Sequence, residues 1–212
     1  LQIAELVGQK GRVLGIDCVD TFLKEARKDA TAKGFSHVEF SRGDAEVALP
    51  ENEFDFVVAR FGTMFFTNPV AALRRMRMAL KPGGQITHIV WRRREDNPAW
   101  QEAKNITLRH LPAPGEDADT CGPGPFSMGN QEMVSIMMKS AGFEDVNFTR
   151  VDEKIMIGTT PEECIAFALN IGPGGEVFRE AGEELAEAKR PEIEREMRVF
   201  FESQERDEKG IW

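Results

Sequence analysis

Apolar and polar positions follow two alternating patterns along the first 91 residues. Short apolar runs that end in Gly or Asp are typical of buried strands, and apolar residues three or four positions apart are typical of helices. The expected strands lie at 12–17, 37–46, 53–62 and 85–91, the second being short and running into a turn. The expected helices lie at 1–8, 20–35 and 68–84. Because helices and strands alternate, the pattern predicts an α/β fold with a doubly wound, mostly parallel sheet.

The pattern changes after Trp91. The elements expected there are an irregular Pro- and Gly-rich stretch at 92–128, a helix at 130–143, a strand at 144–157 and helices from Thr160, broken near Pro191. "TPEE" at 160–163 is a capping box that begins the first of these helices. The predicted division is an α/β core at 1–91, a cap at 92–142, and a last strand with C-terminal helices of the same domain at 143–212.

The net charge limits the classes of partner. The chain has 36 acidic and 27 basic residues, a formal net charge of −9. Nucleic acids and anionic membranes are bound by clustered Lys and Arg, so neither partner is expected. The short basic run "WRRRE" at 91–95 is interpreted as a solvated loop. No apolar run approaches the roughly 18 residues of a membrane span.

Cysteine and histidine positions argue against a disulfide framework or a metal site. The three cysteines, Cys18, Cys121 and Cys164, are far apart and form no CxxC motif. The three histidines are equally scattered. We therefore expect a reducing, cytoplasmic environment and no bound metal.

The acid that ends the first predicted strand is the first candidate binding residue. Ligands of open α/β sheets bind at the carboxyl ends of the strands, and Asp17 stands at such an end. Its carboxylate can accept hydrogen bonds from both hydroxyls of a ribose; the alternative is a turn acid or a helix cap. The next residue, Cys18, is included in the candidate cofactor site.

The ends of the next two strands add four candidates. Asp44, in "GDAE", can accept a hydrogen bond from an adenine amino group while Ala45 packs against the ring; an ordinary turn is the alternative. Arg60 and Phe61 follow the most strand-like segment and are expected to contact the cofactor. In the same stretch Met64, Phe65 and Phe66 are expected to fill the core.

No catalytic residue is identified. The sequence has no GxSxG motif and no Cys/His arrangement, and it contains no Tyr, which argues against the Tyr–Lys chemistry of short-chain dehydrogenases. His110, Glu95 and Asp96 fall in the predicted cap and are general-base candidates, but solvated loop positions explain them as well. The Gly-Pro stretches at 122–125 and 172–175 are interpreted as loops and helix breaks, because Pro removes N–H donors that a phosphate needs.

Four segments, in their order along the chain, resemble the class I S-adenosylmethionine-dependent methyltransferases, most closely the group related to ubiquinone and menaquinone biosynthesis enzymes. These segments are "GRVLGID", "GDAE", "FDFVVARFG" and "NPVAALRRMRMALKPGGQI". The resemblance implies a Rossmann-like fold with a helical cap and S-adenosylmethionine as cofactor. It implies that Asp17 holds the ribose, that Asp44 and Ala45 flank the adenine, and that Arg60 and Phe61 lie near the methionine part.

The two ends of the chain depart from the family pattern. In the family a glycine-rich loop leads into the helix that residues 1–8 resemble, so the resemblance implies that this chain begins after the loop. A closing antiparallel strand is also expected to be missing after "KGIW". Open strand edges leave backbone groups unpaired. We therefore expect a piece of a longer protein or an oligomer that covers its own edges, with a homodimer favoured.

Three functions are compared. The first is a methyltransferase in which a nucleophile of a small, apolar acceptor displaces the sulfonium methyl in line, while the protein aligns and desolvates the reactants. The second is a non-catalytic relic or interaction module that binds no cofactor. The third is a nicotinamide-dependent dehydrogenase, which the lack of a Tyr–Lys pair and the "LKPGG" segment disfavour. The methyltransferase is the favoured function.

Overall fold

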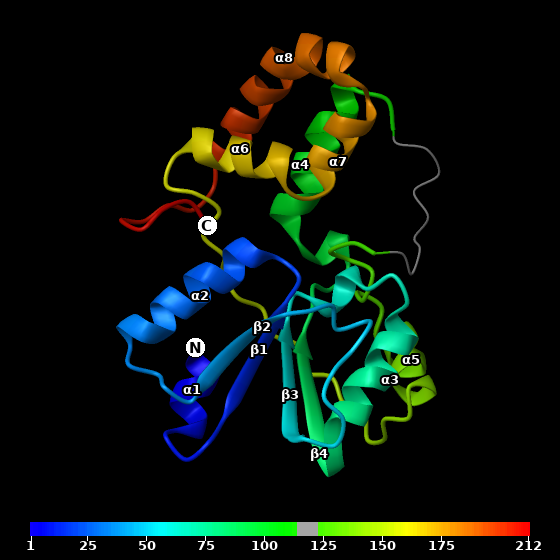
Figure 1. The fold of residues 1–212 in the computed structure, drawn as a ribbon. Helices are drawn as coiled ribbons and strands as arrows, with labels where there is room; N and C mark the ends of the chain where they lie inside the picture. The colour runs from blue at the N-terminus through cyan, green and yellow to red at the C-terminus, as the bar shows by residue number, and fades with distance from the viewer. Residues whose placement is uncertain (114–122) are drawn as a thin grey trace. The chain divides into compact units, whose positions relative to one another are not determined.

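The fold was analysed in a computed structural model that describes residues 1–113 and 123–212. Cys121 and Gly122, the first residue of one predicted Gly-Pro loop, lie outside the described residues. The chain divides into two compact units. The first unit comprises Leu1–Ile89 with Ser135–Val146, and the second comprises Val90–Val134 with Asn147–Trp212. Each unit is followed separately in Figure 1.

The first unit contains the four strands predicted for the N-terminal half. They are β1 (Val13–Asp17), β2 (Val38–Arg42), β3 (Phe54–Arg60) and β4 (Leu80–Ile89). β1 pairs in parallel with β2, and β3 pairs in parallel with β4, so the parallel arrangement is confirmed. Within the described residues these strands form two separate pairs instead of one continuous sheet (Figure 1).

The alternation of backbone hydrogen bonds shows which side of β1 and of β3 is left without a partner strand in the described part of the chain. Neighbouring residues of a parallel strand direct their backbone groups to opposite edges. The Val13 N–H donates to the His37 carbonyl, and the Phe61 N–H donates to the Ile89 carbonyl. Residues such as Leu14 and Val58 therefore direct their backbone groups to the other edge of β1 or β3, with which no described strand pairs.

Three helices of the first unit accompany these strands: α1 (Gln2–Val7), α2 (Asp20–Ala32) and α3 (Pro69–Ala79). α2 packs on β1 and β2, and α3 packs on β4. Asn68 caps α3, since its side-chain oxygen accepts a hydrogen bond from the Ala71 N–H at 3.2 Å. Leu73 and Met76 lie on the buried face of α3.

α3 ends earlier than the sequence pattern suggested. The "LKPGG" segment was assigned to the helix end, but residues from Leu80 onward belong to β4. Pro82 has no N–H with which to continue a helix. The carbonyls of Met78 and Ala79 instead accept hydrogen bonds from the Asn52 and Glu53 N–H groups, which lie just before β3.

The second unit is helical. Its helices are α4 (Pro98–His110), α6 (Pro161–Asn170), α7 (Pro173–Glu180) and α8 (Glu183–Glu202). α5 (Gln131–Ser140) starts in this unit and ends in the first. One buried apolar cluster joins the four helices and the C-terminal Ile211. The predicted cap at Thr160 is confirmed, since its hydroxyl accepts a hydrogen bond from the Glu163 N–H at 3.2 Å.

Three expectations for the C-terminal half are wrong. Residues 98–110 form α4, although the stretch 92–128 was expected to be irregular. No strand forms over 144–157; the nearest pairing is a single antiparallel bridge between Gly158 and Ile211. The last helices do not break at Pro191, because α8 continues through it and the break lies at Ala181 and Gly182.

Two prolines and one glycine account for where these helices start, continue and break. Pro98 occupies the first turn of α4, where its missing N–H costs nothing. Pro191 stands nine positions into α8, and the adjacent Arg190 forms ion pairs with Glu187 and Glu194 along the same helix. Gly182 has a φ of +83°, a left-handed conformation that glycine adopts easily. Residues inside an α-helix have negative φ values, so the helix is interrupted at this position.

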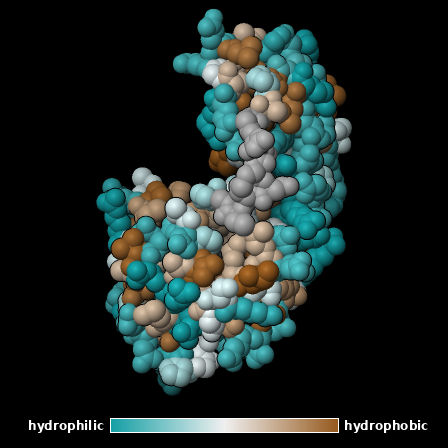
Figure 2. Space-filling view, turned by 90° about the vertical axis from the view of Figure 1, so that its right-hand side faces the viewer, coloured by the Kyte–Doolittle hydropathy of each residue, from teal (hydrophilic) through white to brown (hydrophobic). Residues whose placement is uncertain are grey.

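The face in Figure 2 shows hydrophobic residues separated by hydrophilic ones. Among the described helices none is both long and apolar enough to cross a membrane.

Candidate functional site

Asp17 stands at the carboxyl end of β1 and is half-buried. One carboxylate oxygen, Oδ1, accepts a hydrogen bond from the Val19 N–H at 2.8 Å, just before α2 begins. The other oxygen has no partner among the described residues. The turn role and the ligand role are therefore compatible, because one oxygen fixes the side chain while the second keeps its acceptor capacity. The neighbouring Cys18 is an exposed free thiol.

Asp44 lies at the same end of the first strand pair. Asp17 is opposite Arg42 in the strand register, and the Gly43 N–H donates to the Asp17 carbonyl at 3.0 Å. The Oδ1 atom of Asp44 accepts a hydrogen bond from the Glu46 N–H at 2.8 Å, which makes a local turn. Asp44 is exposed and Ala45 is half-buried. The structure thus brings Asp17, Cys18, Asp44 and Ala45 to the carboxyl end of one strand pair.

Arg60 and Phe61 lie at the corresponding end of the second strand pair. Arg60 is exposed and opposite Ile89. Phe61 has a φ of +55°, a left-handed conformation that is uncommon for any residue except glycine. Such strained residues occur often at functional sites, where the surrounding structure holds them in place. The Phe61 N–H contributes to this by donating to the Ile89 carbonyl at 2.8 Å.

The residues after Phe61 divide between core and surface. Met64 is 1% exposed, so its predicted core position is confirmed. Phe65 is 53% exposed, and its expected core position is wrong, because the 3-10 helix at Thr63–Phe65 turns it outward. Phe66 is half-buried.

A histidine that the sequence did not single out contacts this turn. His88 Nδ1 lies 3.3 Å from the Oγ1 atom of Thr63, a residue that is itself 2% exposed. Burial lowers the pKa of His88, so the neutral imidazole is favoured. The alternation of side chains along β4 could have indicated that His88 is half-buried, because it places His88 on the same half-buried face as Ile86 and Gly84.

Glu46 was also missed, and it connects the two groups of candidates. Its Oε1 accepts a hydrogen bond from the Asn68 N–H at 2.8 Å, and its Oε2 accepts one from the Thr67 N–H at 3.1 Å. The turn after β2 is thereby joined to the segment between β3 and α3. No sequence signal marks this role, because an acid in a turn is usually solvated.

Two of the three candidate bases of the predicted cap, His110 and Asp96, have a side-chain partner. His110 Nε2 lies 2.9 Å from Glu196 Oε1, and Asp96 pairs with Arg92 at 2.9 Å. Glu95 is exposed. In the described part of the chain, no three His, Cys, Asp or Glu side chains gather into a group that could hold a metal ion.

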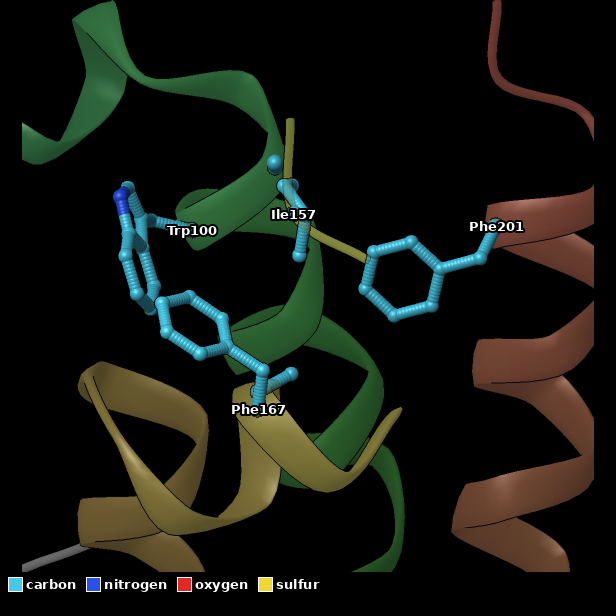
Figure 3. Close-up of a pocket in the computed structure, with 6 residues that line it drawn as sticks. Trp100, Ile157, Phe167 and Phe201 are labelled. Atoms are coloured by element: carbon cyan, nitrogen blue, oxygen red, sulfur yellow. The ribbon is translucent and has the colours of Figure 1, made fainter. Parts of the chain in front are cut away.

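The helical unit has a small apolar hollow. Trp100, Ile157, Phe167 and Phe201 line it, and the rings of Trp100 and Phe167 lie 5.3 Å apart in a tilted arrangement (Figure 3). The hollow has a volume of about 10 Å³, which is roughly the room that one water molecule needs. Small-molecule sites usually have at least about 300 Å³ and a few polar groups. The hollow therefore does not fit a nucleoside cofactor.

Comparisons with known proteins bear on the N-terminal part of the chain. A methyltransferase domain family matches residues 1–87, which include every candidate cofactor residue. A relative from Shewanella sp. (strain ANA-3), named ubiquinone/menaquinone biosynthesis C-methyltransferase UbiE, is 31% identical over 164 residues. By these matches, residues 1–87 are similar to a methyltransferase domain. The match covers 73% of this chain, and the chain spans 65% of the length of that relative.

Solved structures share the Rossmann-like methyltransferase fold. A Bacillus halodurans protein assigned to the methyltransferases has a TM-score of 0.55 at 20% identity, covering 92% of this chain and 70% of that one. The [4+2]-cyclase SpnF has a TM-score of 0.51 at 20% identity, covering 91% and 65%. These likenesses show the fold. Since one neighbour is named for a cyclisation, the reaction must be argued from the site.

Proposed function

We propose that the methyltransferase domain binds S-adenosylmethionine at the carboxyl ends of β1, β2 and β3 and transfers its methyl group to a small, apolar acceptor molecule. The observation that carries the proposal is the pair of acids at the carboxyl end of the first strand pair. Asp17 and Asp44 each have one carboxylate oxygen fixed by a backbone N–H and a second oxygen without a partner among the described residues. Ribose hydroxyls and an adenine amino group are donors that suit these two acceptors.

Each candidate residue receives a role in this proposal. Asp17 accepts from the ribose, with Cys18 beside it, and Asp44 and Ala45 flank the adenine. Arg60 and Phe61 lie near the methionine part; the exposed guanidinium of Arg60 provides the positive charge that suits the methionine carboxylate. S-adenosylmethionine, when bound, supplies an electrophilic methyl group. The protein then needs to align the reactants and exclude water, and no nucleophilic side chain is required.

A calorimetric titration with S-adenosylhomocysteine tests the proposal. Wild type is expected to bind, and Asp17→Ala is expected to raise the dissociation constant about 10- to 100-fold, because hydrogen bonds to a charged group contribute roughly 1.5–3 kcal/mol. Asp29→Ala is the matched control, since Asp29 is an exposed acid on α2 away from the strand end. Its dissociation constant should stay within about twofold of the wild-type value.

Three outcomes would contradict the proposal or part of it. Equal losses in Asp17→Ala and Asp29→Ala would exclude Asp17 from the site. No binding at any ligand concentration would support the relic, and preference for a nicotinamide dinucleotide would support the dehydrogenase. The UbiE-named relative makes a quinone precursor a reasonable first compound in an acceptor screen.

The homodimer and the cytoplasmic location are also proposed from the sequence. The homodimer rests on the strand edges of β1 and β3 with which no described strand pairs. Light scattering coupled to size-exclusion chromatography should give twice the 23.8 kDa chain mass. A monomer over the whole accessible concentration range would exclude it.

A further inference from the structure

Glu46 joins two loops that belong to different strand pairs. The turn after β2 contains Asp44, Ala45 and Glu46, and the segment between β3 and α3 runs from Phe61 to Asn68. The two carboxylate oxygens of Glu46 accept separate hydrogen bonds from Thr67 N–H and Asn68 N–H, at 3.1 and 2.8 Å. Both partners are backbone groups, so the contact fixes the path of the second segment itself.

The same turn fixes Asp44. The Glu46 N–H donates to Asp44 Oδ1 at 2.8 Å, and the N–H groups of Val47 and Ala48 donate to the Asp44 carbonyl. Glu46 therefore makes hydrogen bonds in two directions, through its backbone to Asp44 and through its side chain to the start of α3. A shift of either loop would be transmitted to the other through this one residue.

The second segment carries the strained residue of the site. Phe61 holds a φ of +55°, and the short helix that follows it is anchored by the buried Thr63. In the described residues β1 and β3 are not paired with one another. Backbone pairing between the two strand pairs therefore does not set the spacing of the turn after β2 and the segment after β3, and the Glu46 hydrogen bonds link these two segments directly.

We propose that Glu46 is a positioning residue that holds the Asp44–Ala45 turn at a fixed spacing from the segment that begins at Phe61, so that one ligand can engage both at once. The inference rests on the proposed function, in which the adenine lies at the turn and the methionine part lies at Arg60 and Phe61. Glu46 itself touches neither part of the ligand. Its effect is on how well the two halves of the site act together.

Two ligands of different length separate positioning from simple stabilisation. S-adenosylhomocysteine spans both loops, whereas 5′-methylthioadenosine has the nucleoside without the amino acid. Glu46→Ala should raise the dissociation constant of S-adenosylhomocysteine about tenfold and that of 5′-methylthioadenosine about twofold or less. Glu46→Gln should give an intermediate value, since an amide oxygen can still accept one of the two hydrogen bonds.

A matched control removes a similar charge elsewhere. Glu39 is an exposed acid on β2 whose side chain pairs with Arg12. Glu39→Ala should leave the affinity ratio of the two ligands unchanged. Equal fold-changes for both ligands in Glu46→Ala, or the same change of ratio in Glu39→Ala, would overturn the inference.

Amide hydrogen exchange separates failure of the inference from failure of the proposed function. Exchange at Thr67 and Asn68 should accelerate in Glu46→Gln and Glu46→Ala without any ligand, because their acceptor is weakened or removed. If wild type binds no S-adenosylhomocysteine, the proposed function fails and the positioning role falls with it, even where exchange shows the contact. If wild type binds and the ratio does not change, the positioning role alone is overturned.

Discussion

The two units of the chain maintain their structures in different ways. In the helical unit, residues from α4, α6, α7 and α8 meet in one apolar cluster, and Ile193, Met197 and Phe201 of α8 are at most 1% exposed. In the α/β unit no residue of β1 is fully buried. Its candidate ligand residues stand at strand ends and are held by hydrogen bonds to the backbone of short turns.

Stability and ligand binding depend on different parts of the molecule. Loops at the ends of strands must leave polar groups accessible to a ligand, so they cannot be fixed by burial and depend on contacts such as those of Asp17, Asp44 and Glu46. The apolar cluster of the helical unit instead buries large side chains. Substitutions in the helical core should therefore change stability, and substitutions at strand ends should change affinity.

The largest expected effect is that of Phe201→Ala. Truncation of a phenylalanine that is 1% exposed removes its apolar contacts and leaves a cavity, at a cost of about 3–5 kcal/mol. All three tryptophans, Trp91, Trp100 and Trp212, belong to the helical unit, and the chain has no tyrosine. Urea denaturation followed by tryptophan fluorescence therefore reports this unit selectively.

Val199→Ala is the control for that experiment. Val199 lies on the same helix and is 65% exposed, so its loss should change the free energy of unfolding by less than about 0.5 kcal/mol. If the two substitutions cost the same, the apolar cluster is not what stabilises the helical unit, and the comparison between the units fails.

Two glycines of the helical unit allow a second, smaller effect to be resolved into its causes. Gly172 has a φ of +94°, and a Cβ built there would lie 2.3 Å from the Trp100 ring. Gly182 has a φ of +83° with no atom within 4 Å of its Cβ position. Gly182→Ala should cost about 1–2 kcal/mol for the left-handed conformation alone. Gly172→Ala should cost about 1–3 kcal/mol more, because the ring must move.

The same fluorescence-detected unfolding measures both glycine variants. Equal costs for the two substitutions would show that Trp100 is free to move away from Gly172. The walls of the small apolar hollow would then be loosely packed, and the helical unit would be less rigid than its buried cluster indicates.

The sequence was sufficient for the elements that local signals define. β3, α3 and the capped start of α6 were predicted because an apolar run, Asn68 before Pro69, and Thr160 before Pro161 each act over a few residues. The strand-end positions of Asp17 and Asp44 followed in the same way. α4 was missed because Pro98 and the Pro- and Gly-rich composition around it resembled a loop, although Pro at a first helical turn is favourable.

The contacts that organise the candidate site could not be predicted. Glu46 reaches backbone groups 21 and 22 residues away, and His88 contacts a residue 25 positions away. Contacts at such distances depend on how the strand pairs fold, and neither residue has a local motif. The predicted strand at 144–157 failed for a related reason, since a strand forms only where a partner edge accepts it.

Helix caps in the two units allow a closer comparison of equal interactions. Thr160 caps α6 in the helical unit and Asn68 caps α3 in the α/β unit, each through a hydrogen bond of 3.2 Å to a backbone N–H. Each change to Ala should cost about 1 kcal/mol. Thr160→Ala should shift the fluorescence-detected transition. Asn68→Ala should instead accelerate amide exchange in α3; if it also shifts the fluorescence transition by the same amount, the units unfold together.

The smallest expected effect concerns pH and the α/β unit. Burial lowers the pKa of His88 below its usual value near about 6.5, so between these two pKa values the unfolded chain binds a proton that the folded chain does not. Stability contributed by the neutral imidazole is therefore complete above pH of about 6.5 and declines as the pH falls through that value.

His88→Asn keeps an amide near Thr63 and removes the titration. Amide exchange of the β3 and β4 backbone should show wild type losing protection more steeply on acidification than His88→Asn. Parallel pH profiles of the two proteins would mean that His88 is as well solvated in the folded chain as in the unfolded one.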